Sequence, residues 1–220
     1  MAKRTQGERA GLTRARVLDA AVELVDQRGL QALSMRKLGA ALGVEAMTLY
    51  YYFPSKDALL DGLVEWVIEH SAPVSDKTEV PWDAAMRHHA ETLRSTLLAH
   101  PGVLPLFFTR PAVTPETLRA VERALRTLSD VGFSLALAQD LINAVTIFTV
   151  GHAMSEAGAI ALRARGSASS SALAALDLSE LPLTAKVTGS NRRVNEHKRF
   201  RLGLDALLAG FAALDEDGRS

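Results

Sequence analysis

Residues 34–53 constrain the fold more than any other part of the chain, because two short helical patterns meet there at a tight turn. The first pattern covers residues 35–42 and follows Ser34, whose hydroxyl can cap a helix N-terminus. Gly43 comes directly after this pattern, and glycine readily takes the left-handed conformation that ends a helix. A second short helix starts near residues 45–46. The sequence therefore predicts a helix-turn-helix unit close to the N-terminus.

The second helix combines an apolar inner face with an outer face rich in hydroxyl groups. Leu49 and Phe53 lie four positions apart, so both side chains point toward the core. The outward positions are then Thr48, Tyr51 and Tyr52, with Tyr50 near the boundary. Hydroxyls on an exposed helix can donate to phosphates and base edges in the DNA major groove. The pattern fits a DNA-binding helix-turn-helix, although the turn alone also fits two antiparallel helices of an ordinary core.

Composition supports an all-α protein. The chain has 220 residues, enough for one or two domains with a substantial core. Hydrophobic residues make up 48% and aromatic residues only 5%, a balance that favours helices rich in Ala and Leu. No segment has the alternating pattern of a strand. The chain lacks cysteine, which excludes disulfides, cysteine-bound zinc and a cysteine nucleophile.

The formal net charge of zero hides an uneven distribution of charge. Residues 1–56 hold nine Lys and Arg against five Asp and Glu, a balance of +4. The remaining residues hold sixteen against twenty, a balance of −4. A basic end on a neutral chain fits nucleic-acid binding that is confined to one domain. The balance of +4 is modest, so it supports the DNA-binding interpretation without deciding it.

The sequence divides into three parts. Residues 1–56 are the predicted helix-turn-helix domain: a polar arm, a helix between Thr13 and Gly29, and the two motif helices. Residues 57–81 form a connecting helix and a polar linker; the helix is apolar on more than one side, so it should contact both neighbours. Residues 82–220 form a larger α-helical ligand-binding and dimerisation domain. We therefore expect a three-helix N-terminal domain joined to a larger helical one.

The larger domain contains four long helical patterns and one polar stretch. Residues 164–190 are rich in Ser, Gly and Ala and predict a flexible surface loop, with a short helix at 170–176. The long helical patterns cover residues 82–100, 115–131, 134–163 and 193–214.

The chain carries no sign of a membrane protein or a secretion signal. The N-terminus is basic, but no apolar segment follows it as in a signal peptide. The most apolar region, 133–154, is interrupted by polar residues and predicts a buried helix of a soluble protein. The interrupting residues are Gln139, Asp140, Asn143 and His152. We expect a cytoplasmic protein that does not contact a membrane.

The 134–163 helix also predicts a homodimer. It is apolar on almost every side, and a single domain of this size cannot bury all of them. Together with the last helix and its two-fold mates it would form a four-helix interface. The predicted interface residues are Leu141, Val145, Phe200, Leu204, Leu207 and Phe211.

Residues 14–60, from RARVLDAAVELVDQRG through SMRKLGAALGVEAMTLYYYFPSKDALL, resemble the DNA-binding domain of the tetracycline-repressor (TetR) family. The resemblance implies binding to double-stranded operator DNA. It assigns Thr48 and Tyr51 to base edges, and Arg36, Tyr52 and Lys56 mainly to phosphates. The full set of implied DNA-binding residues is Ser34, Arg36, Ala46, Met47, Thr48, Tyr50, Tyr51, Tyr52 and Lys56.

The second domain also resembles tetracycline repressors, in WDAAMRHHAETLRSTLLAHPG, FFTRP and GFSLALAQDLINAVTIFTVGHAM. The resemblance implies a small-molecule pocket. Leu106 replaces the family's magnesium-ligating histidine, and Ser155 replaces its carboxylate, with Glu156 one place away. We therefore expect a more apolar, metal-free effector. The implied pocket residues are His89, Leu93, Leu106, Phe107, Thr109, Arg110, Ile142 and Phe148.

The predicted function is a homodimeric transcriptional repressor that a small molecule releases from DNA. The alternative is an all-α small-molecule carrier or adaptor whose helix-turn-helix is purely structural. Enzyme motifs are absent, so we expect neither catalysis nor a cofactor. His88 and His89 are adjacent and project about 100° apart on a helix, which argues against a shared metal ion. Arg110 fits a structural ion pair better than an anion site, and both remain open.

Overall fold

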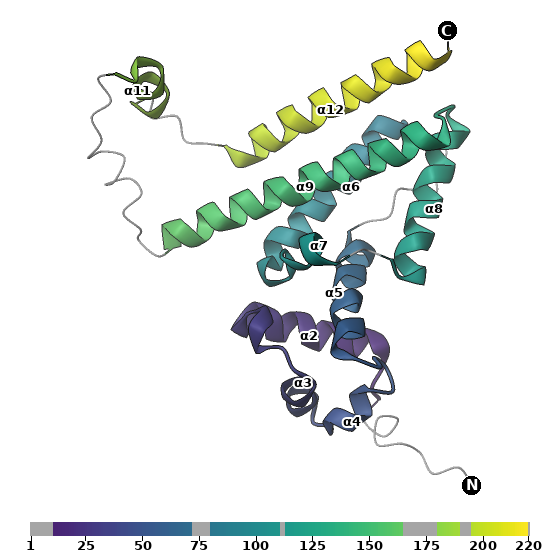
Figure 1. Ribbon diagram of the computed structural model, residues 1–220, viewed down its shortest axis with the longest axis vertical. Coiled ribbons are helices and arrows are strands. Elements are labelled where there is room, and N and C mark those ends of the chain that lie inside the picture. Colours follow the sequence, from purple (N-terminus) through teal and green to yellow (C-terminus); the bar gives the residue numbers. More distant parts are fainter. Residues whose placement is uncertain (1–10, 72–79, 111–112, 165–179, 190–194, 220) are drawn as a thin grey trace.

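The computed structural model describes residues 11–71, 80–110, 113–164, 180–189 and 195–219. Every regular element in these ranges is a helix, as the sequence predicts (Figure 1). In chain order the elements are α2 (Arg14–Arg28), η1 (Leu30–Ala32), α3 (Met35–Leu42), α4 (Ala46–Leu49), α5 (Lys56–His70), α6 (Trp82–Ala99), η2 (Pro101–Val103), α7 (Leu106–Thr109), α8 (Pro115–Asp130), α9 (Leu135–Ala164), α11 (Pro182–Gly189) and α12 (Glu196–Arg219).

The predicted caps of the N-terminal helices are confirmed. The hydroxyl of Thr13 accepts a hydrogen bond from a backbone N–H at the start of α2, 3.2 Å away. Ser34 caps α3 in the same way at 3.2 Å, and Ser55 caps α5 at 3.0 Å. Gly43 ends α3 in the left-handed conformation, with φ 69° and ψ 27°. Side-chain caps and a left-handed glycine satisfy the backbone groups that helix ends leave unpaired.

The turn between α3 and α4 is tight because Gly39 has no side chain. A Cβ at this position would lie 2.8 Å from the carbonyl oxygen of Val44 and 3.1 Å from the backbone nitrogen of Ala46. The turn therefore rests directly on the backbone of α3. Leu49 and Phe53 lie below it, fully buried as predicted. We call α2, α3 and α4 the N-terminal unit, and α6 to α12 the C-terminal domain.

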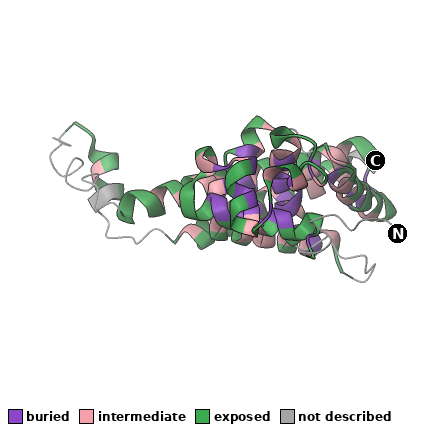
Figure 2. Ribbon diagram, turned by 90° about the horizontal axis from the view of Figure 1, so that it is seen from below, coloured by how far each residue is buried: buried purple, intermediate pink, exposed green. Residues whose placement is uncertain are grey.

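Helix α5 joins the N-terminal unit to the C-terminal domain and packs against both, as predicted (Figure 1). Leu59, Leu63 and Val67 of α5 are fully buried in a hydrophobic cluster that includes residues of α2 and α3. The same cluster continues into α6, η2 and α9 through residues such as Leu97 and Ala153. Figure 2 shows the buried residues gathered in the middle of the molecule. One continuous core therefore spans the predicted boundary at residues 57–81.

Helices α9 and α12 lie side by side over α6 (Figure 1). Their contact buries Leu141, Val145, Phe200 and Leu204 completely within a single chain. These four predicted interface residues therefore hold one protomer together and offer no surface to a second one. Leu207 and Phe211, the other two, are partly buried against the same cluster. Helical periodicity marked these side chains as buried, but it could not tell an internal partner from an external one.

Helix α9 is long and apolar enough to cross a membrane, but only by length and composition. Within the protein it packs against α6, α8 and α12. Only 22% of its most apolar stretch is buried inside one chain. The helix thus has one side in the protein core and other sides that are left uncovered.

Some sequence predictions for the C-terminal domain need correction. Helix α11 lies within the predicted 164–190 loop, where Pro182 is well suited to the first position of a helix. The predicted helix at 170–176 lies outside the described residues. So do residues 1–10 of the predicted arm and residues 72–79 of the predicted linker.

Replacing Gly39 with alanine tests the tight turn. We expect the Cβ to push the turn away from α3 and to lower the free energy of unfolding by about 1–3 kcal/mol, as overpacking does. Ala40→Ser, at the exposed neighbouring position, is the matched control and should leave the stability unchanged. Thermal or urea unfolding followed by circular dichroism measures both. Equal stability of the two variants would show that the turn has room to relax.

Candidate functional site

The predicted DNA-binding residues gather at one end of the molecule, around α4 (Figure 1). Among the large apolar and aromatic residues of the group, Tyr51 is 85% exposed and Met47 is 73% exposed. Arg36 at the start of α3 and Lys56 at the start of α5 are also exposed. Because Leu49 and Phe53 point into the core, the other side of this segment, with Met47 and Tyr51, faces solvent. The end of the molecule thus presents an apolar tip, hydroxyls and flanking cations, the groups that contact bases and phosphates.

The structure reverses the expected roles of two tyrosines. Tyr50 is exposed, whereas Tyr52 is partly buried, and its hydroxyl donates to the carbonyl oxygen of Leu12 at 2.8 Å. The ring of Tyr52 also meets Tyr51 edge to face, with centroids 5.2 Å apart. Tyr52 therefore ties the segment before α2 to the segment after α4. Helical spacing missed this bond because its acceptor lies 40 residues away.

Two further residues of the set have structural roles in addition to the DNA contact predicted for them. The Ser34 hydroxyl is engaged in the α3 cap, and Ala46 is partly buried against the core. Thr48 is partly exposed. Their predicted contact with DNA stays a prediction.

A partly buried ion pair links the N-terminal unit to α5. Arg14, the first residue of α2, donates through both terminal nitrogens to the carboxylate of Glu65, one of these bonds measuring 2.9 Å. The Glu65 side chain is completely inaccessible to solvent, and that of Arg14 is 43% exposed. The bond to Glu65 is the main reason that the pKa of Arg14 rises, which keeps the guanidinium charged. The sequence offered one signal for this contact: Glu65 interrupts the apolar pattern of α5 between Val64 and Trp66.

A cavity of about 690 Å³ lies between α5, α6, α8 and α9, with α7 at one side. This volume is typical of small-molecule sites. Four of the predicted pocket residues line it: His89, Leu93, Phe107 and Ile142.

The structure does not bring the other four predicted pocket residues into the cavity wall. Leu106 is buried in the core, and the Thr109 hydroxyl donates to the carbonyl of Pro105, the N-cap of α7. Phe148 stacks on Phe200. Arg110 donates to Asp61 at 2.7 Å and also binds Asp57, both on α5. The structural ion pair is therefore the alternative that the structure supports for Arg110.

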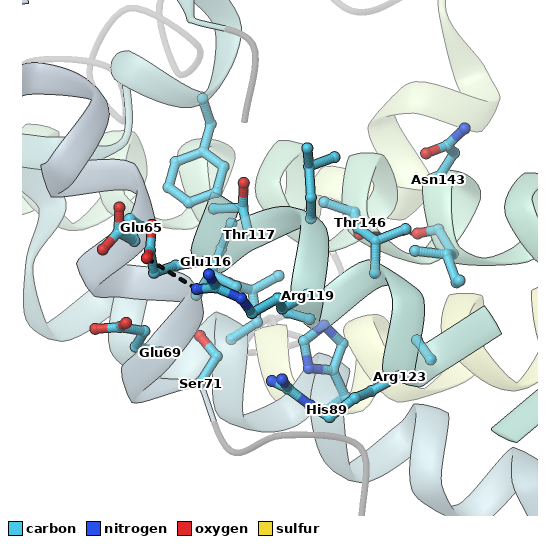
Figure 3. Close-up of a pocket in the computed structure, with 18 of the residues that line it drawn as sticks. Glu65, Glu69, Ser71, His89, Glu116, Thr117, Arg119, Arg123, Asn143 and Thr146 are labelled. Atoms are coloured by element: carbon cyan, nitrogen blue, oxygen red, sulfur yellow. Dashed lines mark hydrogen bonds and ion pairs between the residues drawn. The ribbon is translucent and has the colours of Figure 1, made fainter. Parts of the chain in front are cut away.

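The cavity is more polar than the sequence predicts. Figure 3 shows Glu65, Glu69 and Glu116 at one end of it, with Arg119 bound to Glu116 at 2.9 Å. Burial, together with the charge of Glu65, raises the pKa of Glu69. A backbone hydrogen bond and Arg119 lower the pKa of Glu116. Helical spacing placed the α8 residues on faces of a helix but did not reveal which face would meet α5.

Glu156, the acidic residue next to Ser155, is occupied by other contacts. It accepts from Nε of Arg94 at 3.1 Å and from Nη2 at 2.5 Å. Nδ1 of His152 lies 3.7 Å from the same carboxylate and has no hydrogen bond. Burial lowers the pKa of His152, which favours its neutral form. Among the residues that the structure describes, no three His, Asp or Glu side chains are grouped to hold a metal ion.

Comparison with known proteins gives consistent matches along the chain. Residues 17–63 match "Bacterial regulatory proteins, tetR family", and residues 74–214 match "Tetracyclin repressor-like, C-terminal domain". Tetracycline repressor protein class D of Escherichia coli is 31% identical over 92% of this chain and 90% of its own length. The HTH-type transcriptional repressor Rv1353c of Mycobacterium tuberculosis is 29% identical over 94% and 82%, respectively.

A solved structure agrees with the sequence matches. The Streptomyces coelicolor TetR family protein ActR, in complex with actinorhodin, superposes with a TM-score of 0.75 and 25% sequence identity. The superposition covers 93% of this chain and 98% of that protein.

Lys56→Ala tests the predicted phosphate contact. We expect weaker binding to every DNA sequence, and a salt dependence that is flatter by about one unit of slope, because one phosphate contact is lost. Lys186→Ala, at an exposed lysine on the distant helix α11, is the control (Figure 1). Fluorescence anisotropy at several salt concentrations measures both. An unchanged slope for Lys56→Ala would show that Lys56 does not contact a phosphate.

Proposed function

Because the chain belongs to the tetracycline-repressor (TetR) family, we propose that the surface around α4 binds its operator and that the cavity beside α5 binds its effector. The protein is a ligand-responsive transcriptional repressor that binds operator DNA as a homodimer and is released by a small molecule. The observation that carries the proposed sites is the position of α5. Leu59 and Leu63 pack in the shared core with the N-terminal unit, while Glu65 and Glu69 line the cavity.

Release from DNA requires a difference between two conformations. The two α4 surfaces of a dimer must match half-sites about 34–36 Å apart, one turn of DNA. An effector changes that spacing only if it binds the DNA-free conformation better, typically by about 1–3 kcal/mol of coupling free energy. Movement of α5 would change the spacing, because this helix contacts both the N-terminal unit and the cavity.

The effector in this proposal has a largely apolar body and needs no metal. Leu93, Phe107 and Ile142 supply apolar walls. Leu106 and Ser155 occupy the two positions where the family has metal-binding residues. The neighbouring Glu156 is bound by Arg94. The acidic end of the cavity adds a polar requirement. A hydrogen-bond donor or a positive charge on the effector would suit Glu69, which makes no hydrogen bond or ion pair with the described residues.

The proposed dimer interface uses the outer sides of α9 and α12. On α12 the exposed positions facing away from α9 form a stripe, and α9 carries a similar stripe. Small side chains in both stripes would let helices of two protomers approach closely, as in a four-helix bundle. The stripe residues are Leu202, Ala206, Ala209 and Ala213 on α12, and Gly151, Ser155, Gly158 and Leu162 on α9.

Two further features belong to the proposal. The relatives are transcriptional regulators and not enzymes, and we assign no catalytic role to this chain. A repressor that binds chromosomal DNA works in the cytoplasm, and α9 fits the core and the dimer interface better than a membrane span. A carrier or adaptor with a purely structural helix-turn-helix would leave the exposed Tyr51 and Met47 without a role.

A gel-shift experiment tests the proposed DNA-binding surface. The full-length protein should shift DNA from upstream of its own coding region, and added salt should weaken the complex steeply. The double variant Thr48→Ala, Tyr51→Ala should bind that fragment no better than unrelated DNA. A variant that binds with wild-type specificity would place the operator surface elsewhere.

Leu202→Glu tests the proposed dimer interface. Leu202 is 72% exposed in one chain, so a charge there should leave the protomer folded and repel the partner helix. We expect a monomer by light scattering and the loss of operator binding. Val131→Glu, an exposed apolar position outside α9 and α12, should remain dimeric. A dimeric Leu202→Glu variant would move the interface to another surface.

Isothermal titration with tetracycline tests the metal-free cavity. We expect binding weaker than micromolar, because Leu106 offers no ligand atom and Ser155 offers no carboxylate to the magnesium of a magnesium–tetracycline chelate. The titration is repeated with magnesium and with a chelator, and the two curves should agree. Tight binding that depends on magnesium would contradict the proposed effector chemistry.

A further inference from the structure

We propose that the Arg14–Glu65 ion pair couples the cavity to α4, with Arg14 acting as a positioning residue for the DNA-binding surface. The proposal rests on the function proposed above. Neither Arg14 nor Glu65 belongs to the set of residues predicted to contact DNA, and the carboxylate of Glu65 is engaged by Arg14.

Glu65 stands at the boundary between the cavity and the N-terminal unit. It forms part of the cavity wall, yet its side chain has no exposure to solvent, and both its carboxylate oxygens face Arg14. In the described part of the chain, its hydrogen bonds come from Arg14 alone, and both carboxylate oxygens are used. A buried carboxylate that loses its cation is strongly destabilised, so Arg14 must follow any displacement of this part of α5.

Arg14 in turn contacts the segment that follows α4. Its guanidinium lies over the ring of Phe53, with 4.9 Å between the guanidinium carbon and the ring centroid. Two residues before Arg14, the carbonyl of Leu12 accepts the hydroxyl of Tyr52 at 2.8 Å. The N-terminal end of α2 therefore contacts Tyr52 and Phe53, the two residues that follow the exposed Tyr51. A shift of Arg14 would reorient the residues that face DNA.

The other end of α2 is anchored to the C-terminal domain. Asp26 lies 2.6 Å from Nδ1 of His100, just after α6. Gly102 sits so close to α2 that an added Cβ would lie 2.6 Å from a methyl carbon of Val25. Motion of α5 at Glu65 would thus act on α2 against a fixed far end. Asp19, which accepts from the indole of Trp66 at 2.7 Å, lies between the two ends.

Glu69 places a second carboxylate on the same cavity wall, one helical turn after Glu65. Both glutamates line the cavity, so their like charges repel each other, and burial together with this repulsion raises the pKa of Glu69. An occupant of the cavity that approaches Glu69 changes the electrostatic balance around Glu65 and hence the pull on Arg14. This repulsion connects occupancy of the cavity with the ion pair.

Glu65→Gln tests the route without an effector. The substitution keeps the shape and removes the charge, and a fully buried residue of α5 cannot touch DNA. We expect the full-length dimer to bind operator DNA about tenfold more weakly, within the range usual for coupled sites, with an unchanged salt slope. Glu156→Gln is the matched control: it breaks the Arg94 pair, whose side chains are 12% and 13% exposed, between α6 and α9. It should alter the melting temperature but not the DNA affinity.

A double-mutant cycle separates coupling from direct contact. Arg14→Gln should weaken binding as much as Glu65→Gln, and the double variant should be no weaker than either, because both disrupt one interaction. Arg14→Lys retains the charge and the fold but loses the two-nitrogen contact, and it should fall between wild type and Arg14→Gln. If Glu65→Gln fails to fold, Arg14→Lys and Tyr52→Phe carry the test, and wild-type affinity in both would overturn the proposal.

Two results would reject the proposal in different ways. If Arg14→Gln weakens binding and flattens the salt slope while Glu65→Gln does neither, Arg14 is a phosphate contact. If both variants bind like wild type, the pair is purely structural. Failure of the wild-type protein to bind its upstream DNA at low salt would instead reject the proposed operator surface, so the two failures remain distinguishable.

Discussion

Burial of α5 on several sides is the constraint on which the remaining structure depends. A helix that is apolar on one face can rest on a single partner, but Leu59, Leu63 and Val67 of α5 are covered by a cluster that runs from α2 to α9. The free energy of burying this surface therefore favours one arrangement of the N-terminal unit on the C-terminal domain. Any change in the cavity wall that moves α5 must also repack this shared core. The fold thus provides the contact between sites that a ligand-responsive repressor needs.

Charge supplies the specific contacts within that packing. Arg14 meets the fully buried Glu65, Arg94 meets Glu156, and Arg110 meets two aspartates of α5 that are more exposed. Removing one partner from a pair with a buried carboxylate, such as Glu65 or Glu156, costs far more than the pair itself contributes, so these two contacts specify geometry more than they add stability. The exposed pairs, such as Arg126 with Glu122, contribute little by comparison.

The inner sides of α9 and α12 close the protomer, and their outer sides form the proposed dimer interface. Phe200 and Leu204 close the protomer, while the outer stripes remain uncovered in a single chain. A second copy of the chain would bury the apolar sides of α9 that a single protomer leaves exposed. In the family to which this chain belongs, the homodimer is also what presents two DNA-binding surfaces at once.

The sequence by itself determined most local elements, though not α11: the capping residues, the left-handed Gly43, the boundaries of the long helices to within about five residues, and the inward orientation of Leu49 and Phe53. These follow from interactions within about four residues along the chain, which composition and helical period encode directly. Only the tertiary structure decided the contacts that join distant segments. Glu65 meets a residue 51 positions away, and Tyr52 meets one 40 positions away. Helical period gives the direction of a side chain but not the element that packs against it, which depends on the whole core.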